Sequence, residues 1–126
     1  MDKAHYKGLS RPLLETTIGE HLESVATAQP DHPALIVRHQ DIHWSYSTFL
    51  TEVDSLAAGL LDIGIEIGDR VGIWAPNCVE WVLTQFATAR VGAILVCVNP
   101  AYRIYELEYA LNKVECKALV LSLIHI

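Results

Sequence analysis

Two glycines, Gly68 and Gly72, are the nearest candidates in this sequence for a phosphate-binding loop. Such a loop needs glycines directly after a strand, so that backbone N–H groups can approach the phosphate oxygens. Here the two glycines lie before and within the strand expected over residues 70–75, and the turn that follows is Ala75-Pro76-Asn77. That turn has no glycine, and its proline has no N–H to donate. The spacing therefore does not predict a nucleotide cradle.

Histidines and cysteines are the candidates for metal or thiol chemistry. His39 and His43 are four residues apart, a spacing that suits a metal ion on a helix but not on the hairpin expected here. Cys78, Cys97 and Cys116 are odd in number, widely spaced and without a CxxC pair, so neither a zinc site nor a disulfide framework is predicted. We expect the cysteines to be small buried apolar side chains in a reducing compartment, taken to be the cytoplasm.

Acid–base and nucleophilic candidates are equally weak. Glu106 and Glu108 are two residues apart, and on a helix that spacing points the side chains to different faces. No serine lies in a Gly-x-Ser-x-Gly turn, which is the setting that exposes a serine nucleophile at the end of a strand. The residues by themselves therefore predict no catalytic, cofactor-binding or metal-binding residue.

Composition limits which classes of protein this chain can belong to. The chain has 126 residues, is 52% apolar and carries a net charge of −6, which fits a small folded domain and argues against a nucleic-acid partner. The longest apolar run, Val91–Val98, is too short to cross a bilayer, so no transmembrane segment is expected. Residues 1–10 are polar and lack the apolar core of a signal peptide.

The first half of the chain predicts two helices and a hairpin. Thr17 and Glu20 have the spacing of a capping box, and Pro30 closes the helix that follows. Two short apolar runs, 34–37 and 42–44, flank a polar turn and predict a β-hairpin. Ser45 is expected to cap a longer helix that Gly64 ends. Apolar residues at helical spacing mark the buried faces, namely Leu22, Val25 and Ala26, then Phe49, Leu50, Val53, Leu56, Ala57, Leu60 and Leu61.

The second half alternates strands and helices. Strands are expected over 70–75, 94–98 and 118–121, with helices from Asn77 to Gly92 and from Ile104 to Val114. This βαβαβ order predicts an α/β fold with a parallel sheet and right-handed crossovers. The strand 94–98 is a continuous apolar run, mostly β-branched, and is expected to be buried on both faces. The helices are expected to cover little more than one face of the sheet, leaving the other for strands outside this chain.

The helix between the first two parallel strands has its apolar stripe at Val79, Val82, Leu83, Phe86 and Ala89. Its phase predicts that Leu83 and Phe86 face the sheet. The same phase places Glu80 and Arg90 towards solvent.

Several blocks, in order and at matching spacing, resemble the beginning of the adenylate-forming (AMP-binding) superfamily. They cover residues 17 to about 120. Three stretches together are most similar to fatty-acid–CoA ligases of the bacterial medium- and long-chain type, namely Trp74-Ala75-Pro76-Asn77, Glu80-Trp81 and Asn99-Pro100-Ala101-Tyr102-Arg103. The full set of matching blocks is Thr17–Leu22, Pro30–Leu35, Trp44–Tyr46, Leu61–Ile73, Asn77–Trp81, Arg90–Ala93 and Asn99–Leu111.

The resemblance implies a two-step ligase reaction: fatty acid, ATP and CoA give acyl-CoA, AMP and pyrophosphate through an acyl-adenylate. It also implies ATP, Mg²⁺ and CoA as the ligands of the full-length enzyme. The family's phosphate loop, its acidic ribose-binding motif and its catalytic lysine have no counterpart here, so no site residue is carried over. We expect this chain to bind none of the three ligands and to be inactive alone.

Residues 1–120 are thus expected to be the opening portion of the AMP-binding N-terminal domain, truncated. Residues 121–126, Leu-Ser-Leu-Ile-His-Ile, match the conceptual translation of a sequencing adapter and are expected to be an assembly scar. The alternative is a small Rossmann-like binding module, or an interaction domain, without catalysis.

Overall fold

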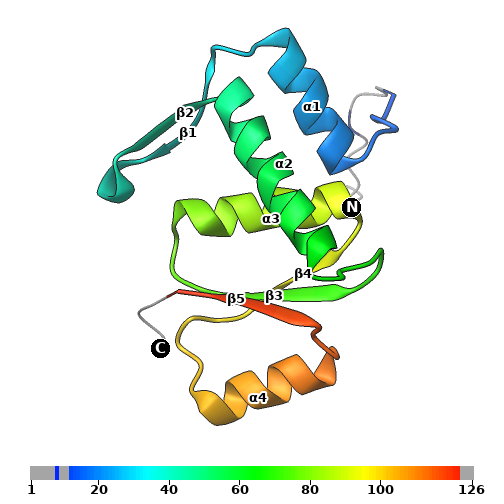
Figure 1. Ribbon diagram of the computed structural model, residues 1–126, viewed down its shortest axis with the longest axis vertical. Coiled ribbons are helices and arrows are strands. Elements are labelled where there is room, and N and C mark those ends of the chain that lie inside the picture. Colours follow the sequence, from blue (N-terminus) through cyan, green and yellow to red (C-terminus); the bar gives the residue numbers. More distant parts are fainter. Residues whose placement is uncertain (1–7, 9–11, 123–126) are drawn as a thin grey trace, which may run out of the picture.

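The computed structural model describes residue 8 and residues 12–122. It has the predicted α/β order, with a hairpin among helices followed by a βαβαβ unit (Figure 1). The elements are α1 (Ile18–Ala28), β1 (Pro33–Val37), η1 (Arg38–Gln40), β2 (Ile42–Ser45), α2 (Tyr46–Asp62), β3 (Arg70–Trp74), α3 (Val79–Val91), β4 (Ile94–Cys97), α4 (Ile104–Lys113) and β5 (Ala118–Leu121).

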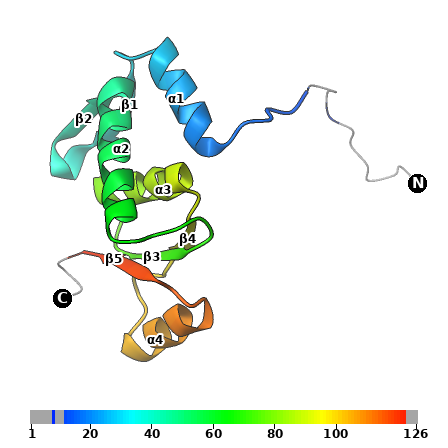
Figure 2. The same ribbon diagram turned by 45° about the vertical axis from the view of Figure 1, so that its right-hand side comes forward.

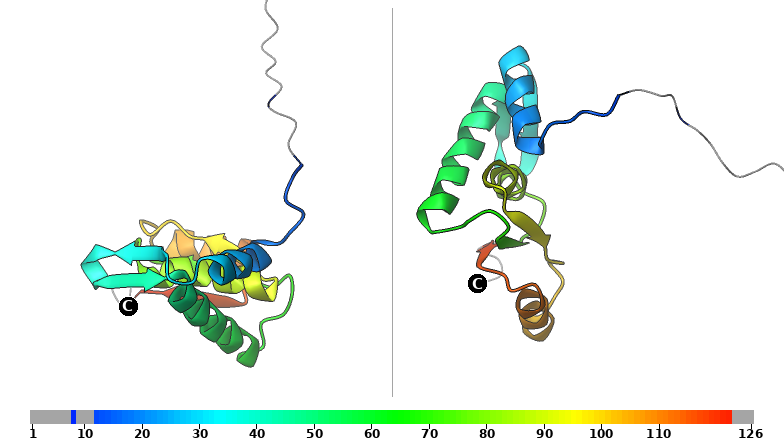
Figure 3. Two further views of the ribbon diagram at one scale, coloured as in Figure 1. Left: turned by 90° about the horizontal axis from the view of Figure 1, so that it is seen from above. Right: turned by 90° about the vertical axis from the view of Figure 1, so that its right-hand side faces the viewer.

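The three parallel strands lie in the order β4-β3-β5, with Val71 of β3 opposite Leu95 and Ala118. The chain steps from β3 to β4 in one direction and then crosses back over β3 to reach β5. Because parallel crossovers are right-handed, this reversal places α3 and α4 on opposite faces of the sheet. Figures 1 and 3 show α3 on one side of the strands and α4 on the other. The face that is expected to lie open is therefore partly covered by α4, although α4 has no buried residue and a groove remains between it and β4.

The strand β4 was predicted to be buried on both faces, and this too is wrong. Within the described residues, β4 pairs with β3 alone and forms an edge of the sheet. Ile94 is 53% exposed, and Cys97 at the other end of the strand is also exposed. The fully buried strand is β3, whose Val71 and Ile73 have no exposed surface. A β-branched run predicts a strand, but its place in the sheet depends on the strand order.

The helix caps that the sequence predicts for α1 and α2 are confirmed. The hydroxyl of Thr17 accepts from the backbone N–H of Glu20 (3.2 Å), and the Glu20 carboxylate accepts from the N–H of Thr17 (2.9 Å). Ser45 accepts from the N–H of Thr48 at the start of α2. Gly64 and Gly92, after α2 and α3, both have the positive φ that glycine adopts without strain.

The apolar stripes of α1 and α2 are confirmed in their main positions, which are buried between the helices. One outer position differs: Leu61, the last residue of the α2 stripe, is 56% exposed in the last turn of its helix. Figure 2 shows α1 and α2 side by side above α3.

The phase predicted for α3 is wrong, because this helix is buried on two faces. Leu83 and Phe86 pack against α1 and α2, where Phe86 meets the ring of Phe49 edge-on at 5.3 Å between centroids. The sheet-facing side carries Ala87, which packs on Val71.

Two threonines explain why the second face of α3 was missed. Thr84 and Thr88 are almost completely buried, although a polar residue ordinarily indicates an exposed face. Their hydroxyls donate to the helix carbonyls of Glu80 (2.7 Å) and Thr84 (2.8 Å), so each buried oxygen has a partner within its own helix. Small, internally satisfied side chains allow α3 to pack closely against the sheet.

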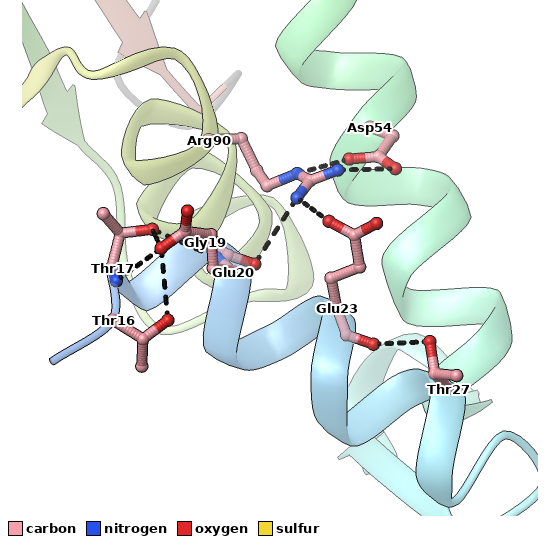
Figure 4. Close-up of polar contacts among 8 residues, drawn as sticks. All are labelled: Thr16, Thr17, Gly19, Glu20, Glu23, Thr27, Asp54 and Arg90. Carbon is pink, nitrogen blue, oxygen red and sulfur yellow. Dashed lines mark hydrogen bonds and ion pairs between the residues drawn. The ribbon is translucent and has the colours of Figure 1, made fainter. Parts of the chain in front are cut away.

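Arg90 links α1, α2 and α3 on the side of α3 that packs against the other two helices (Figure 4). Its guanidinium donates to Asp54 of α2 (2.8 and 3.3 Å) and to Glu23 of α1 (2.8 Å). The two carboxylates raise the pKa of the Arg90 guanidinium above its usual value. The Arg90 side chain is 23% exposed, whereas the sequence placed it towards solvent. Because three helices meet at one cation, Arg90 fixes how α1 and α2 sit on α3.

Replacing Arg90 by methionine is expected to lower the free energy of unfolding by about 1–2 kcal/mol. The change keeps the apolar stem but leaves two carboxylates without their cation, and solvent reaches both carboxylates and reduces the loss. Urea denaturation of the chain measures the effect. Arg103→Met, at an exposed residue before α4, is the matched control and should change stability by less than about 0.5 kcal/mol. Equal effects of the two substitutions would contradict this role.

Candidate functional site at the carboxyl edge of the sheet

The carboxyl ends of β3 and β4 lie at the same edge, where open α/β sheets bind their ligands. β3 leads into Ala75-Pro76-Asn77, and β4 into Val98-Asn99-Pro100. Together with Trp81, these two turns line a surface depression of about 540 Å³. The position is the expected one for a ligand site, so the donors available there decide what it can bind.

Several donors at this edge are already used or missing. Trp74 donates its indole N–H to the carbonyl of Asn99 (3.2 Å), and the Asn99 side chain accepts from the N–H of Ala101 (2.9 Å). Pro76 and Pro100 have no N–H. The bond from Trp74 joins the two turns to each other, and a proline in each turn interrupts the row of N–H groups that a phosphate loop needs.

At the N-terminus of α3, a backbone N–H group is likewise used, here by a side chain from the hairpin. Gln40 accepts the N–H of Val79 through Oε1 (2.7 Å) and donates through Nε2 to the carboxylate of Glu80 (3.0 Å). A helix N-terminus otherwise offers such N–H groups to an anion. The bond from Gln40 lowers the pKa of Glu80, so a negative charge lies beside this N-terminus. The Gln40 cap and the Glu80 carboxylate are therefore unfavourable for a nucleotide phosphate at this N-terminus.

Gln40 is the one site residue that sequence analysis missed. It lies 39 residues before Val79, in a polar turn, and a single glutamine there gives no signal. The sequence predicts instead that Asn77 begins the cap of α3, whereas the observed N-cap is Cys78, which makes no side-chain capping bond. The hairpin thus supplies the cap that local sequence lacks.

The thiols and histidines stay apart from one another. Burial raises the pKa of the Cys78 thiol, which disfavours the reactive thiolate. Cys116 is half-buried and Cys97 is exposed, so the expectation of buried cysteines is wrong for Cys97. His39 in η1 and His43 on β2 are both exposed. Among the described residues, no group of three His, Cys, Asp or Glu side chains could hold a metal ion.

A second hollow, the β4–α4 groove, lies beside the depression at the strand ends. It has a volume of about 560 Å³ and lies between the edge strand and α4. Its lining is mainly apolar and aromatic, with Val96, Cys97 and Val98 on or just after β4, and Tyr105 and Tyr109 on α4. One charge of each sign, Glu106 and Lys113, also borders it. Such a lining fits packed apolar groups better than a charged ligand.

The turn Gly68-Asp69-Arg70 joins the sheet to α4. Asp69 accepts from the N–H of Glu66 (2.7 Å) and from Lys117 Nζ (2.6 Å). Arg70 donates to the carbonyl of Val114 at the end of α4 (2.6 Å) and to Glu115 (2.9 Å). This part of the sequence therefore shapes the fold and holds the α4–β5 connection.

The described part of the chain is thus an α/β unit. Its parallel strands are arranged as in nucleotide-binding sheets, but none of the described strands is followed by a glycine-rich phosphate loop. No described helix has both the length and the apolar content that a membrane span requires.

Comparison with known proteins identifies the family. The model of the AMP-binding enzyme family matches residues 22–125, so the chain belongs to that family. The mitochondrial medium-chain acyl-CoA ligase of Bos taurus is 53% identical over 108 residues, which is 86% of this chain and 18% of that protein. The corresponding human ligase is 53% identical over 104 residues, which is 82% of this chain and 17% of that protein.

Solved structures confirm the fold. A fatty acyl CoA synthetase of Mycobacterium tuberculosis superposes with a TM-score of 0.84 at 27% identity, covering 86% of this chain and 22% of that one. This chain therefore spans about a fifth of the length of the relatives that it matches.

The charge of Asp69 gives a prediction about pH. Hydrogen bonds from Lys117 and from the Glu66 N–H lower its pKa in the folded chain. A carboxyl whose folded pKa is depressed stabilises the fold above its unfolded pKa of about 4 and loses that contribution as the pH falls through the folded value. Asp69→Asn keeps the turn bond but loses the charge, so it should be less stable than the parent at pH 7, and the difference should shrink towards pH 3.

Thermal melting from pH 3 to pH 7 measures this dependence. Asp62→Asn, at an exposed residue in the last turn of α2, is the control and should follow the parent curve closely. A constant stability difference between Asp69→Asn and the parent at every pH would refute the assigned role of the charge.

Proposed function

We propose that this chain is the opening portion of the N-terminal domain of an AMP-forming acyl-CoA synthetase. The complete enzyme would join a fatty acid to CoA, consuming ATP and releasing AMP and pyrophosphate through an acyl-adenylate. The observation that carries the proposal is the 53% identity with a medium-chain acyl-CoA ligase over 86% of the chain. Identity at that level over a continuous α/β unit favours a medium-chain fatty acid as the substrate.

Within that enzyme, this portion acts as scaffold. ATP, Mg²⁺ and CoA would bind elsewhere in the polypeptide, because the strand-end turns here use their own donors and Gln40 fills the start of α3. When bound, the nucleotide and its metal supply the activated phosphate that makes the carboxylate reactive. The residues of this chain contribute the β3-centred sheet and the helices that support it, and the chain by itself would be inactive.

The alternative of a small independent binding module has less support. A Rossmann-like module needs its own phosphate contacts at the strand ends, and the described edge holds Pro76, Pro100 and the carboxylate of Glu80 instead. The cytoplasm remains the proposed compartment for this chain. Three free cysteines, one of them exposed, support a reducing environment.

A chimaeric enzyme tests the proposal. Residues 17–120 of this chain replace the aligned segment of the Bos taurus ligase, and acyl-CoA formation from a medium-chain fatty acid is measured. A shared scaffold predicts that the chimaera keeps at least about a tenth of the parent kcat/KM, a loss of no more than about 1.4 kcal/mol of transition-state stabilisation. The chain alone should release no pyrophosphate above the enzyme-free blank.

Two variants of the chimaera serve as controls. Gly72→Val places a side chain where a Cβ would lie 3.0 Å from Leu119 and 3.1 Å from the Cys116 sulfur, so it should lower both stability and yield. Glu108→Gln, at an exposed position of α4, should change neither. A folded chimaera without ligase activity, or pyrophosphate release by the chain alone, would overturn the proposed function.

A further inference from the structure

The connection from α2 to β3 exposes three large apolar side chains close together in the chain. Leu61 is 56% exposed, Ile63 is 67% exposed and Ile67 is 87% exposed, whereas Ile65 between them is buried. A folded surface ordinarily carries such side chains singly, and a group of them marks a contact surface. The fold buries one isoleucine of this connection and leaves the others for a partner.

This connection lies against the C-terminal end of α3. The N–H of Gly68 donates to the carbonyl of Gly92 (2.9 Å), and a Cβ at Gly92 would lie 3.2 Å from Cγ1 of Ile67. Figure 1 shows that α2 and α3 end on the same side of the molecule, where the green loop from α2 to β3 protrudes. We call this surface the helix-end patch, which consists of Leu61, Asp62, Ile63, Glu66 and Ile67.

The charge of the helix-end patch is negative. Asp62 and Glu66 are exposed, and neither forms an ion pair within the described residues. Residues 39–69 contain no lysine or arginine. The ends of α2 and α3 add partial negative charge, because the last carbonyls of a helix lack helical partners. The cations of the adjoining elements are already paired with carboxylates of this chain, namely Arg70, Arg90 and Lys117.

The helix-end patch also lies away from the edge where open α/β sheets bind ligands. It precedes the amino end of β3, whereas ligands bind at the carboxyl ends of the strands. Further strands of a sheet add beside β4 or β5 and not at the strand ends. A partner on the patch would therefore leave both the carboxyl edge and the growth of the sheet unhindered.

We propose that the helix-end patch binds a basic amphipathic segment of another protein. Apolar side chains of that segment would lie on Ile63 and Ile67, and its lysine or arginine side chains beside Asp62 and Glu66. Charge selects this occupant: a second copy would set like charges against each other, and an anionic membrane would repel the patch. The inference goes beyond the proposed function and does not depend on it, because the patch belongs to this chain.

Two synthetic helical peptides of equal length test the proposal. Both carry leucine along one face, which is flanked by lysine in one peptide and by glutamate in the other. Fluorescence anisotropy measures their binding to the 126-residue chain. We expect the lysine peptide to bind with a Kd of about 100 μM or tighter, as for a small transient interface, and at least about tenfold more tightly than the glutamate peptide.

One pair of variants tests the apolar contact. Ile67→Lys should weaken binding of the lysine peptide about tenfold or more, because it removes an apolar contact and adds a like charge. Ile36→Lys, at another exposed isoleucine, on β1, is the matched control and should leave binding unchanged. Equal losses in the two variants would contradict the proposed site.

A charge exchange gives an independent readout. Asp62→Lys combined with Glu66→Lys should shift the preference of the chain towards the glutamate peptide. Glu52→Lys combined with Glu108→Lys changes the net charge equally at exposed positions of α2 and α4 and should keep the preference for lysine. A reversal in both double variants would show an effect of net charge alone and would overturn the site.

The remaining outcomes concern the occupant. A dimer of the chain in sedimentation that Ile67→Lys abolishes would assign the patch to a second copy. Binding to phosphatidylcholine vesicles that depends on Ile67 would assign it to a lipid surface, and either result would overturn the proposal. So would a chimaera of residues 17–120 that fails to bind the lysine peptide, because the patch would then be covered in a complete ligase. An inactive chimaera that binds the peptide would keep this inference and remove only the proposed function.

Discussion

The strand β3 sets the arrangement of every other described element. It is paired on both sides by parallel strands, and its Val71 and Ile73 are completely buried. A strand in that position needs apolar cover on both faces, since neither face can meet water. The helices α2 and α3 provide it on one side and α4 on the other (Figure 3). Gly72 allows the close approach of Leu119 and Cys116, because a Cβ there would lie 3.0–3.1 Å from both side chains.

The sequence predicted the local features of this fold because they are set by nearby residues. The capping box of Thr17 and Glu20, the cap at Ser45, the turn glycines and the three parallel strands all follow from spacing within a few positions. Apart from the cap predicted at Asn77 for α3, where the N-cap is Cys78, the errors concern tertiary placement. Strand order decided that β4 is an edge and that α4 covers the second face, and no local pattern contains that information.

The helix α3 shows, within a single element, the same limit on what a local sequence pattern can predict. Its apolar stripe was identified, but Leu83 and Phe86 proved to contact helices, because the sheet-facing side consists of alanine and of threonines that bond within the helix.

At the candidate site, the absence of a glycine loop was visible in the sequence, whereas the cap from Gln40 was not. A hydrogen bond between residues 39 positions apart has no sequence signature. The origin of the stretch 121–126 stays a prediction: Leu121 completes β5 opposite Trp74, and residues 123–126 lie outside the described residues.

The central claim is that this part of the synthetase fold is scaffold and holds no nucleotide site. Amide NMR spectra of the chain, recorded during titration with Mg·ATP, test it most directly, and dispersed signals verify that the chain is folded. We expect no saturable shift at residues 75–80 or 98–101 up to about 5 mM nucleotide, where a site with a Kd of about 1 mM would be mostly filled. Saturable binding to the unchanged chain would by itself contradict the account.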